Sequence, residues 1–258
     1  AKRTFLILLV AAFAATLGLG VISPFLPELV GRHKANGLWI AMIFAGFAFS
    51  RGIIMPFAGK LSDRFGRKLF VGGGLFLFSL VSLLYPQAHS LFDLAVVRMV
   101  HGLAAGMVIP IVVAYAGECA KETEKGGTAG WLLMTFYFGL AAGPFMGGLL
   151  NQELGFSSVF YAMGLLAFLA FLVVLFFLPD SKSQMKTQAI VVPFRDLIRY
   201  NFIRAVLLIA VVTTVLIAVF MAFVPSLAAA IDIDPDHIGI IISVGILIAG
   251  ALQIPFGR

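Results

Sequence analysis

Charged residues are scarce in this chain: Asp, Glu, Lys and Arg together make up 12% of its 258 residues, whereas 61% are hydrophobic. A soluble domain usually carries about 25% charged residues, so the chain has too few to cover a water-facing surface. No alternation typical of barrel strands is present, and lipid offers the backbone no hydrogen-bond partners. The composition therefore excludes a soluble globular protein and predicts an all-α integral membrane protein.

Residues that carry chemistry are also scarce. The single cysteine, Cys119, excludes an internal disulfide, and a small buried apolar residue is its ordinary reading. The four histidines are scattered, and the sequence has no phosphate-binding loop, no metal-spaced cluster and no nucleophile–base set. We therefore expect no enzyme activity, no cofactor and no metal site, and an ion gradient rather than ATP as the energy source.

Eight apolar stretches are long enough, or nearly so, to cross a bilayer as helices of about 20 residues. Their expected limits are Thr4–Pro27, Gly37–Gly59, Leu69–Tyr85, Leu94–Cys119, Gly127–Leu149, Ser157–Leu178, Arg204–Ala230 and Ile238–Gly257. The first follows Lys2 and Arg3 as a signal peptide would, but it is longer than the roughly 7 to 15 residues of a signal core. We expect it to remain as a span.

Lysine and arginine set the expected orientation, because they concentrate in loops on the cytoplasmic side. Eleven of them fall in alternate loops, with Lys2 and Arg3 on the same side, whereas the opposite loops hold only Arg32 and Lys34. We expect the N-terminus in the cytoplasm and the protein in a bacterial inner membrane, as a monomer. The net charge of +6 follows this membrane pattern and does not indicate nucleic-acid binding.

The chain repeats itself after a shift of 198 residues. Phe25 and Pro27 then fall on Phe223 and Pro225, and Gly59 falls on Gly257. This predicts a six-helix bundle at residues 1–178, a cytoplasmic linker at 179–203, and the first two helices of a second bundle at 204–258. The linker is either an interfacial amphipathic helix or a flexible connector. The second unit stops early, so we expect the chain to be incomplete.

The stretch GKLSDRFGRK, residues 59–68 and here called the latch motif, carries five charges between two apolar runs. It resembles in full the G-x-L-x-D-R-x-G-R-K signature of the major facilitator superfamily. The resemblance implies the major facilitator fold and a cytoplasmic latch that stabilises the outward-open state. Gly59 would let its helix pack closely, Gly66 would permit a sharp turn, and Asp63 would hold Arg64 or Arg67. Lys68 would help keep the loop in the cytoplasm; a plain positive-inside loop is the alternative.

Three further motifs resemble those of the twelve-helix drug–proton antiporter family. LGLGVISPFLP, residues 17–27, resembles the first-helix motif through Gly18, Pro24 and Pro27. LAVVRMVHGLAAG, residues 94–106, resembles the fourth-helix motif, in which a buried arginine is implicated in proton coupling. Arg98 would be that arginine and His101 a titratable neighbour. Alternatively, Arg98 snorkels to the helix end and His101 only makes a structural hydrogen bond.

The stretch from 130 to 148 fits the antiporter motif G-x8-G-x3-G-P-x2-G-G at every position. Its members are Gly130, Gly139, Gly143, Pro144, Gly147 and Gly148. The resemblance implies an exporter rather than a symporter. The glycines allow close helix contact, and Pro144 removes a backbone hydrogen bond and lets the helix bend.

The expected substrate cavity lies between the two bundles, where Arg51 and Glu28 are candidate lining residues. Arg51 sits beside a small-residue face of its helix. It could line the cavity, pair with Glu28 or Asp93, or act as a packing strut. No Asp or Glu falls at mid-membrane depth in the eight stretches, which departs from many polyspecific exporters.

The resemblance implies proton-coupled export of small organic compounds or drugs, with protons and the lipid bilayer as the other partners. The two buried arginines keep open a carrier of an anionic metabolite or a lipid-like substrate. A non-transporting receptor or scaffold on the same fold is the third possibility.

Overall fold

The structure is a computed structural model that describes residues 2–31, 37–180, 196, 198–230 and 240–248. Seven long helices have defined bounds: α1 (Lys2–Gly31), α2 (Gly37–Phe65), α3 (Arg67–Ser82), α4 (Leu91–Cys119), α5 (Lys125–Leu154), α6 (Phe156–Phe177) and α8 (Asn201–Ala230). Two short 3-10 helices, Tyr85–Gln87 and Glu122–Glu124, flank α4, and residues 240–248 are helical. Within these ranges there is no strand.

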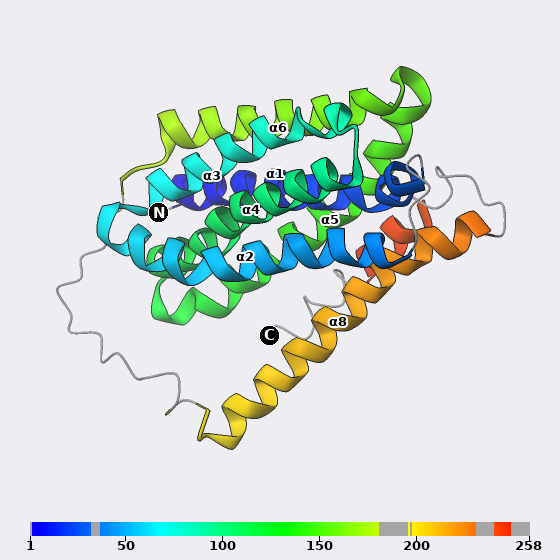
Figure 1. Ribbon diagram of the computed structural model, residues 1–258. Coiled ribbons are helices and arrows are strands. Elements are labelled where there is room, and N and C mark those ends of the chain that lie inside the picture. Colours follow the sequence, from blue (N-terminus) through cyan, green and yellow to red (C-terminus); the bar gives the residue numbers. More distant parts are fainter. Residues whose placement is uncertain (1, 32–36, 181–195, 197, 231–239, 249–258) are drawn as a thin grey trace.

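Helices α1 to α6 are each long and apolar enough to cross a membrane, and they lie side by side as a bundle (Figure 1). Helix α1 is central: it packs against α4, α5 and α6, while α2 lies along α4, and α3 fits between α4 and α6. Lipid tails are as apolar as the core, so close packing rather than water exclusion must hold these helices together. The expected six-helix bundle is present.

Helix α2 ends six residues later than the sequence predicts. The prediction placed its end at Gly59, but the helix continues to Phe65, through the first part of the latch motif. The charged residues from Lys60 to Arg64 do not stop it, because a helix end that reaches past the apolar layer can carry charge in water. The turn falls at Gly66, whose φ of 104° favours glycine.

The start of α4 is fixed by its own capping box. The Ser90 hydroxyl accepts from the Asp93 N–H at 3.0 Å, and Asp93 Oδ2 accepts from the Ser90 N–H at 3.0 Å. Such a cap contributes about 1 kcal/mol. The carboxylate of Asp93 is therefore occupied at the helix end, and the suggested pairing of Arg51 with Asp93 is wrong for this structure.

Helix α8 lies at an angle to the bundle (Figure 1). Its first seventeen residues, 201–217, are nearly all exposed, whereas Phe220 and Val224 pack with Ile242 and Ile246 against α5. Residues 201–230 and 240–248, here called the second unit, thus meet the six-helix bundle around the middle of α5. Most of the linker predicted at 179–203, and part of the eighth predicted span, lie outside the described residues.

Candidate functional site

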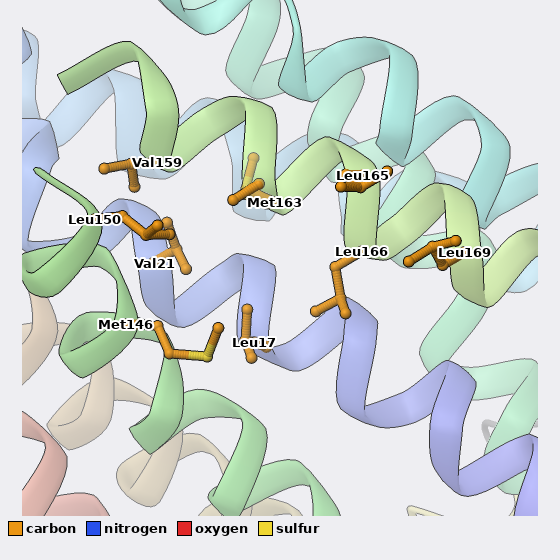
Figure 2. Close-up of a pocket in the computed structure, with 10 residues that line it drawn as sticks. Leu17, Val21, Met146, Leu150, Val159, Met163, Leu165, Leu166 and Leu169 are labelled. Carbon is orange, nitrogen blue, oxygen red and sulfur yellow. The ribbon is translucent and has the colours of Figure 1, made fainter. Parts of the chain in front are cut away.

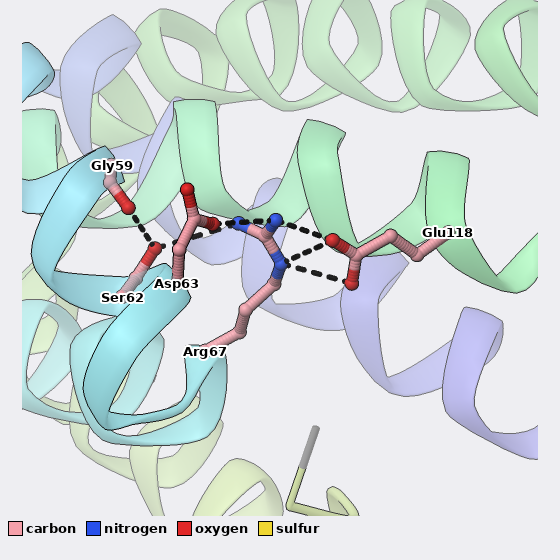
Figure 3. A network of polar contacts seen from close by, with 5 residues as sticks. All are labelled: Gly59, Ser62, Asp63, Arg67 and Glu118. Carbon is pink, nitrogen blue, oxygen red and sulfur yellow. Dashed lines mark hydrogen bonds and ion pairs between the residues drawn. The ribbon is translucent and has the colours of Figure 1, made fainter. Parts of the chain in front are cut away.

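Arg67 is the centre of a polar network at the end of the bundle where α2 and α3 meet (Figure 3). Its Nε lies 2.9 and 3.0 Å from the two carboxylate oxygens of Glu118 on α4. Its Nη2 contacts Asp63 Oδ1 at 2.8 Å and also contacts Glu118. Its Nη1 donates to Ser62 Oγ at 3.4 Å. One arginine, 7% exposed, therefore ties α2, α3 and α4 together.

The latch motif residues do not all join this network. Asp63 meets Arg67 as the sequence suggested, but Arg64 is exposed, with its guanidinium 5.3 Å from the ring centre of Phe65. The expectation that Gly59 brings α2 close to a neighbour is wrong within the described residues. No atom of theirs lies within 4 Å of a Cβ placed there. Lys68 lies at the start of α3, beside a groove on the outer flank of the bundle.

Glu118 completes this network, and the sequence did not single it out. It lies 51 positions from Arg67, at the last turn of α4. Its only sequence signal is an acid at the end of an apolar run, on the same side of the membrane as the latch motif. All the described partners of Arg67 belong to the first unit.

Arg98 and His101 lie together inside the bundle. Arg98 is 3% exposed and His101 is fully buried. The guanidinium of Arg98 stacks over Phe47 at 4.7 Å from its ring centre, and over Phe44 at 5.2 Å. Cation–π contacts of this kind stabilise a desolvated cation. The alternative that Arg98 snorkels to the helix end is therefore wrong.

His101 makes the structural hydrogen bond that the sequence allowed. Its Nδ1 lies 2.8 Å from the hydroxyl of Tyr85, which the sequence did not single out and which is also fully buried. The rings of Phe47 and Phe78 meet the imidazole edge-on. Among the described residues, Arg98 Nε and His101 Nε2 have no hydrogen-bond partner. The cluster thus holds one cation, one imidazole and unmet hydrogen-bonding capacity.

The antiporter motif forms the contact between α5 and α1. A Cβ at Gly143 would lie 2.5 Å from both the Leu17 carbonyl oxygen and the Val21 nitrogen. A Cβ at Gly139 would lie 2.9 Å from the Phe13 carbonyl oxygen, and one at Gly147 would lie 2.7 Å from the Phe25 ring. Gly148 is buried beside them. By contrast, Gly130 has no described neighbour within 4 Å, so its place in the motif is not explained by packing here.

Pro144 changes the same interface. It has no N–H, so the carbonyl of Leu140 one turn earlier loses its helical partner. Gly20 of α1 lies directly against that carbonyl, because a Cβ at Gly20 would overlap its oxygen and come within 3.1 Å of Pro144 Cδ. The absence of a side chain at Gly20 thus lets the backbones of α1 and α5 meet where α5 lacks one of its backbone hydrogen bonds. Gly18 of the first-helix motif packs similarly closely, against Phe78 and Met163.

The other face of α5 meets the second unit. Ser243 donates to the Ala141 carbonyl at 2.6 Å. Ala141, Ile242 and Ile246 form a buried apolar cluster, with Tyr137 and Phe220 packed against it. The antiporter motif therefore lies on a helix that α1 holds on one side and the second unit holds on the other.

A wholly apolar cavity of about 140 Å³ lies where α1, α5 and α6 meet (Figure 2). Leu17 and Val21 come from α1, Met146 and Leu150 from α5, and the remaining lining residues from α6. It has no polar side chain that could orient a ligand. Leu165 and Leu169 on its rim are exposed, so it is an open hollow beside the glycine contact.

The backbone at Arg51 packs against α4, because a Cβ at Gly102 would lie 3.2 Å from the Arg51 nitrogen. Its Nε is buried and has no hydrogen-bond partner among the described residues. The small-residue face beside it is exposed at Ala41, Ala45, Ala48, Gly52 and Pro56. Helix α1 stays helical through Pro24, Pro27 and Glu28, but these three side chains lie outside what the structure describes.

Comparison with known proteins identifies the fold. The model of the Major Facilitator Superfamily matches residues 8–258. The chain belongs to the major facilitator superfamily. It is therefore an integral, multi-pass membrane protein and not an enzyme.

Individual relatives agree with this assignment. The quinolone resistance protein NorA of Staphylococcus aureus is 29% identical over 247 residues, which cover 95% of this chain and 63% of NorA. The uncharacterized MFS-type transporter MJ1560 of Methanocaldococcus jannaschii is 26% identical over 264 residues, covering 100% and 68%. The crystal structure of the human organic anion transporter MFSD10 (TETRAN) superposes with a TM-score of 0.74 at 17% identity, covering 100% of this chain and 72% of that one. The chain thus spans 63% of the length of NorA.

Proposed function

We propose that this chain is part of a secondary active transporter that exports small organic compounds or drugs in exchange for protons. The observation that carries the proposal is the packing of α5 between α1 and the second unit. A complete antiporter motif packs on α1 through Gly139, Gly143 and Gly147, and the opposite face of the same helix binds the second unit. The likeness to the quinolone resistance protein NorA supports export.

The arrangement of the two units supports alternating access. They meet through Ser243 and Ala141, and Ala141 lies just past the middle of α5 on the side away from the cytoplasmic end, as lysine and arginine set it. We assign this contact to a state that is closed to the outside. Reopening outward requires the α5 contact with residues 240–248 to break.

The latch motif would act at the cytoplasmic end. The Arg67 network fixes the shape of the α2–α3 turn from within the first unit. In the outward-open state this preformed turn would present its exposed residues to the second unit. The network therefore prepares a docking surface, rather than bridging the two units itself in the conformation described.

Proton coupling is assigned to the cluster of Arg98, His101 and Tyr85. Protonation of His101 would place a second positive charge beside Arg98 in an apolar shell, where like charges repel strongly. The protonated cluster would therefore favour a conformation that opens it to water or to an anion. This would convert a proton into a bias between the two states.

A second candidate function is the carriage of an anionic or lipid-like substrate. It rests on Arg51 and Arg98, whose Nε groups are buried without described hydrogen-bond partners, since a buried cation is costly unless it is paired. A substrate carboxylate or phosphate would supply the missing partner.

One experiment separates the two candidates. The complete protein is placed in liposomes with a trapped pH dye and an imposed proton gradient, and cationic, neutral and anionic compounds are added in turn. Proton flux triggered by lipophilic cations or neutral drugs supports drug–proton antiport. Flux with anions only, lost in Arg51→Ala, supports the second candidate. Full flux with unchanged pH dependence in Arg98→Ala would remove Arg98 from the coupling mechanism.

A further inference from the structure

Four aromatic side chains pack in series at the end of the bundle opposite the α2–α3 turn, and we call them the aromatic ladder. The ring centres of Tyr85 and Phe160 lie 5.0 Å apart, with an angle of 16° between the ring planes. Phe160 contacts Phe156 at 5.2 Å, and Phe156 meets Phe25 edge-on at 6.0 Å. The ladder therefore joins the 3-10 helix that follows α3 to α6, and then to α1.

The first ring of the ladder contacts His101. The Tyr85 hydroxyl lies 2.8 Å from His101 Nδ1. When His101 is neutral, the hydroxyl can donate to this nitrogen; when His101 is protonated, the nitrogen carries a hydrogen and the hydroxyl must accept instead. Tyr85 is fully buried, and a close-packed interior has no free space for its ring. A change in this contact must therefore displace the neighbouring ring.

The surroundings of His101 make its protonation costly. The charge that acts on it is that of Arg98 on the same helix. The neighbouring elements present three uncharged side chains to the imidazole: Tyr85, Phe47 and Phe78. Helix α2 also carries Arg51, a second cation, whose backbone meets α4 at Gly102. Helix α6 has no charged residue, and those of α1 and α5 lie at the ends of these helices. Repulsion between His101 and Arg98 is therefore relieved by movement.

The last ring of the ladder lies against the antiporter motif. A Cβ at Gly147 would lie 2.7 Å from the Phe25 ring, so the buried ring rests on the bare backbone of α5. A displacement of Phe25 thus acts directly on α5, beside its contact with α1. The same helix carries Ala141, whose carbonyl accepts from Ser243 of the second unit.

We infer that the aromatic ladder couples the protonation of His101 to the position of α5, with Phe160 as the positioning residue at its centre. This inference rests on the proposed function, and it gives the proton step a physical connection to the contact that must open. Coupling between distant sites is carried by packed side chains that have two discrete arrangements. Here the two arrangements are those with the Tyr85 hydroxyl as donor and as acceptor.

Labelling of Ala141→Cys measures the opening without any transported compound, because Ala141 is fully buried in the cluster with the second unit. The complete protein in detergent, with its other cysteines replaced by serine, reacts with a water-soluble maleimide at acidic and at neutral pH. His101→Gln in the same background gives the pH dependence of the thiol alone. We expect acid to speed labelling beyond this baseline. Phe160→Leu should reduce that excess by about two- to tenfold, the value of one aromatic pair.

Matched variants separate the ladder from general destabilisation. Phe168→Leu makes the same change on α6 at an exposed side chain outside the ladder, and should leave the pH effect unchanged. Phe156 is only half-buried, so its variants fold even if Phe160→Leu does not. Phe156→Leu should reduce the pH effect, and Phe156→Tyr, which keeps the ring, should retain it.

Two results would overturn the inference. A pH effect that survives both leucine variants would show that the ladder does not carry the coupling, and would leave the proposed function intact. The same pH dependence with His101 as with His101→Gln would show that no proton at His101 reaches α5. Antiport itself is decided separately, by compound-driven proton flux in liposomes.

Discussion

A single methyl group added at Gly143 should disrupt the contact between α1 and α5. The new Cβ would lie 2.5 Å from the Leu17 carbonyl oxygen and the Val21 nitrogen, and 2.7 Å from the Gly20 carbonyl carbon. All three are backbone atoms, so no side chain can rotate away. The two helices would have to separate by about 1 Å to restore ordinary van der Waals distances.

The expected cost of Gly143→Ala is about 1–3 kcal/mol, as for other overpacked sites. Domains of 150–250 residues lose about 2–4 °C of melting temperature per kcal/mol. We therefore expect a melting temperature in detergent that is lower by several degrees, together with loss of compound-driven proton flux. Gly127→Ala, on the same helix but outside the antiporter motif, is the matched control, because no described atom lies within 4 Å of its Cβ position.

The separation of the helices should also be visible directly. Spin labels on the exposed faces of α1 and α5 should report a longer distance in Gly143→Ala than in Gly127→Ala. If the two variants have the same melting temperature and the same transport rate, the glycine contact does not carry the role assigned to it, and the reasoning is refuted.

Three further changes have definite expected outcomes. Glu118→Gln removes the carboxylate that holds Arg67. Because the Glu118 side chain is 39% exposed, we expect the free energy of unfolding to fall by about 1–2 kcal/mol; an unchanged melting temperature would contradict this. Ser243→Ala should speed labelling of a cysteine placed at the outer end of α5 by about fivefold, the value of one hydrogen bond. Thr213→Ala, whose hydroxyl only bonds within its own helix, should not. Tyr85→Phe removes the hydroxyl that lies 2.8 Å from His101 Nδ1 and should change the pH dependence of proton flux; an unchanged pH profile would separate this cluster from coupling.

The sequence predicted the bundle because long apolar runs and the one-sided distribution of lysine and arginine are local signals. It also predicted that the glycines of the antiporter motif permit close helix contact. It could not name α1 as their partner, because that depends on how distant helices pack. Gly20 shows the same limit: its role depends on a carbonyl that Pro144 frees more than a hundred positions later.

The polar sites divide in the same way. Asp63 and Arg67 are four residues apart, so their pairing could be read from the spacing. Glu118 and Tyr85 could not be found from spacing, since each reaches its partner only through the packing of helices around α4. The predicted end of α2 at Gly59 was wrong because the first charged residues mark the end of the apolar layer, and the helix continues beyond that layer to Phe65.

The direction of proton movement tests the central claim most directly. The complete protein is reconstituted in liposomes loaded with a transported compound and a pH dye, with no proton gradient imposed, and the liposomes are diluted into compound-free buffer. Antiport predicts that the compound leaving one way drives protons the other way, so the lumen acidifies. Alkalinisation would show symport, and a constant pH during measured efflux would show uncoupled transport; either result would contradict the account.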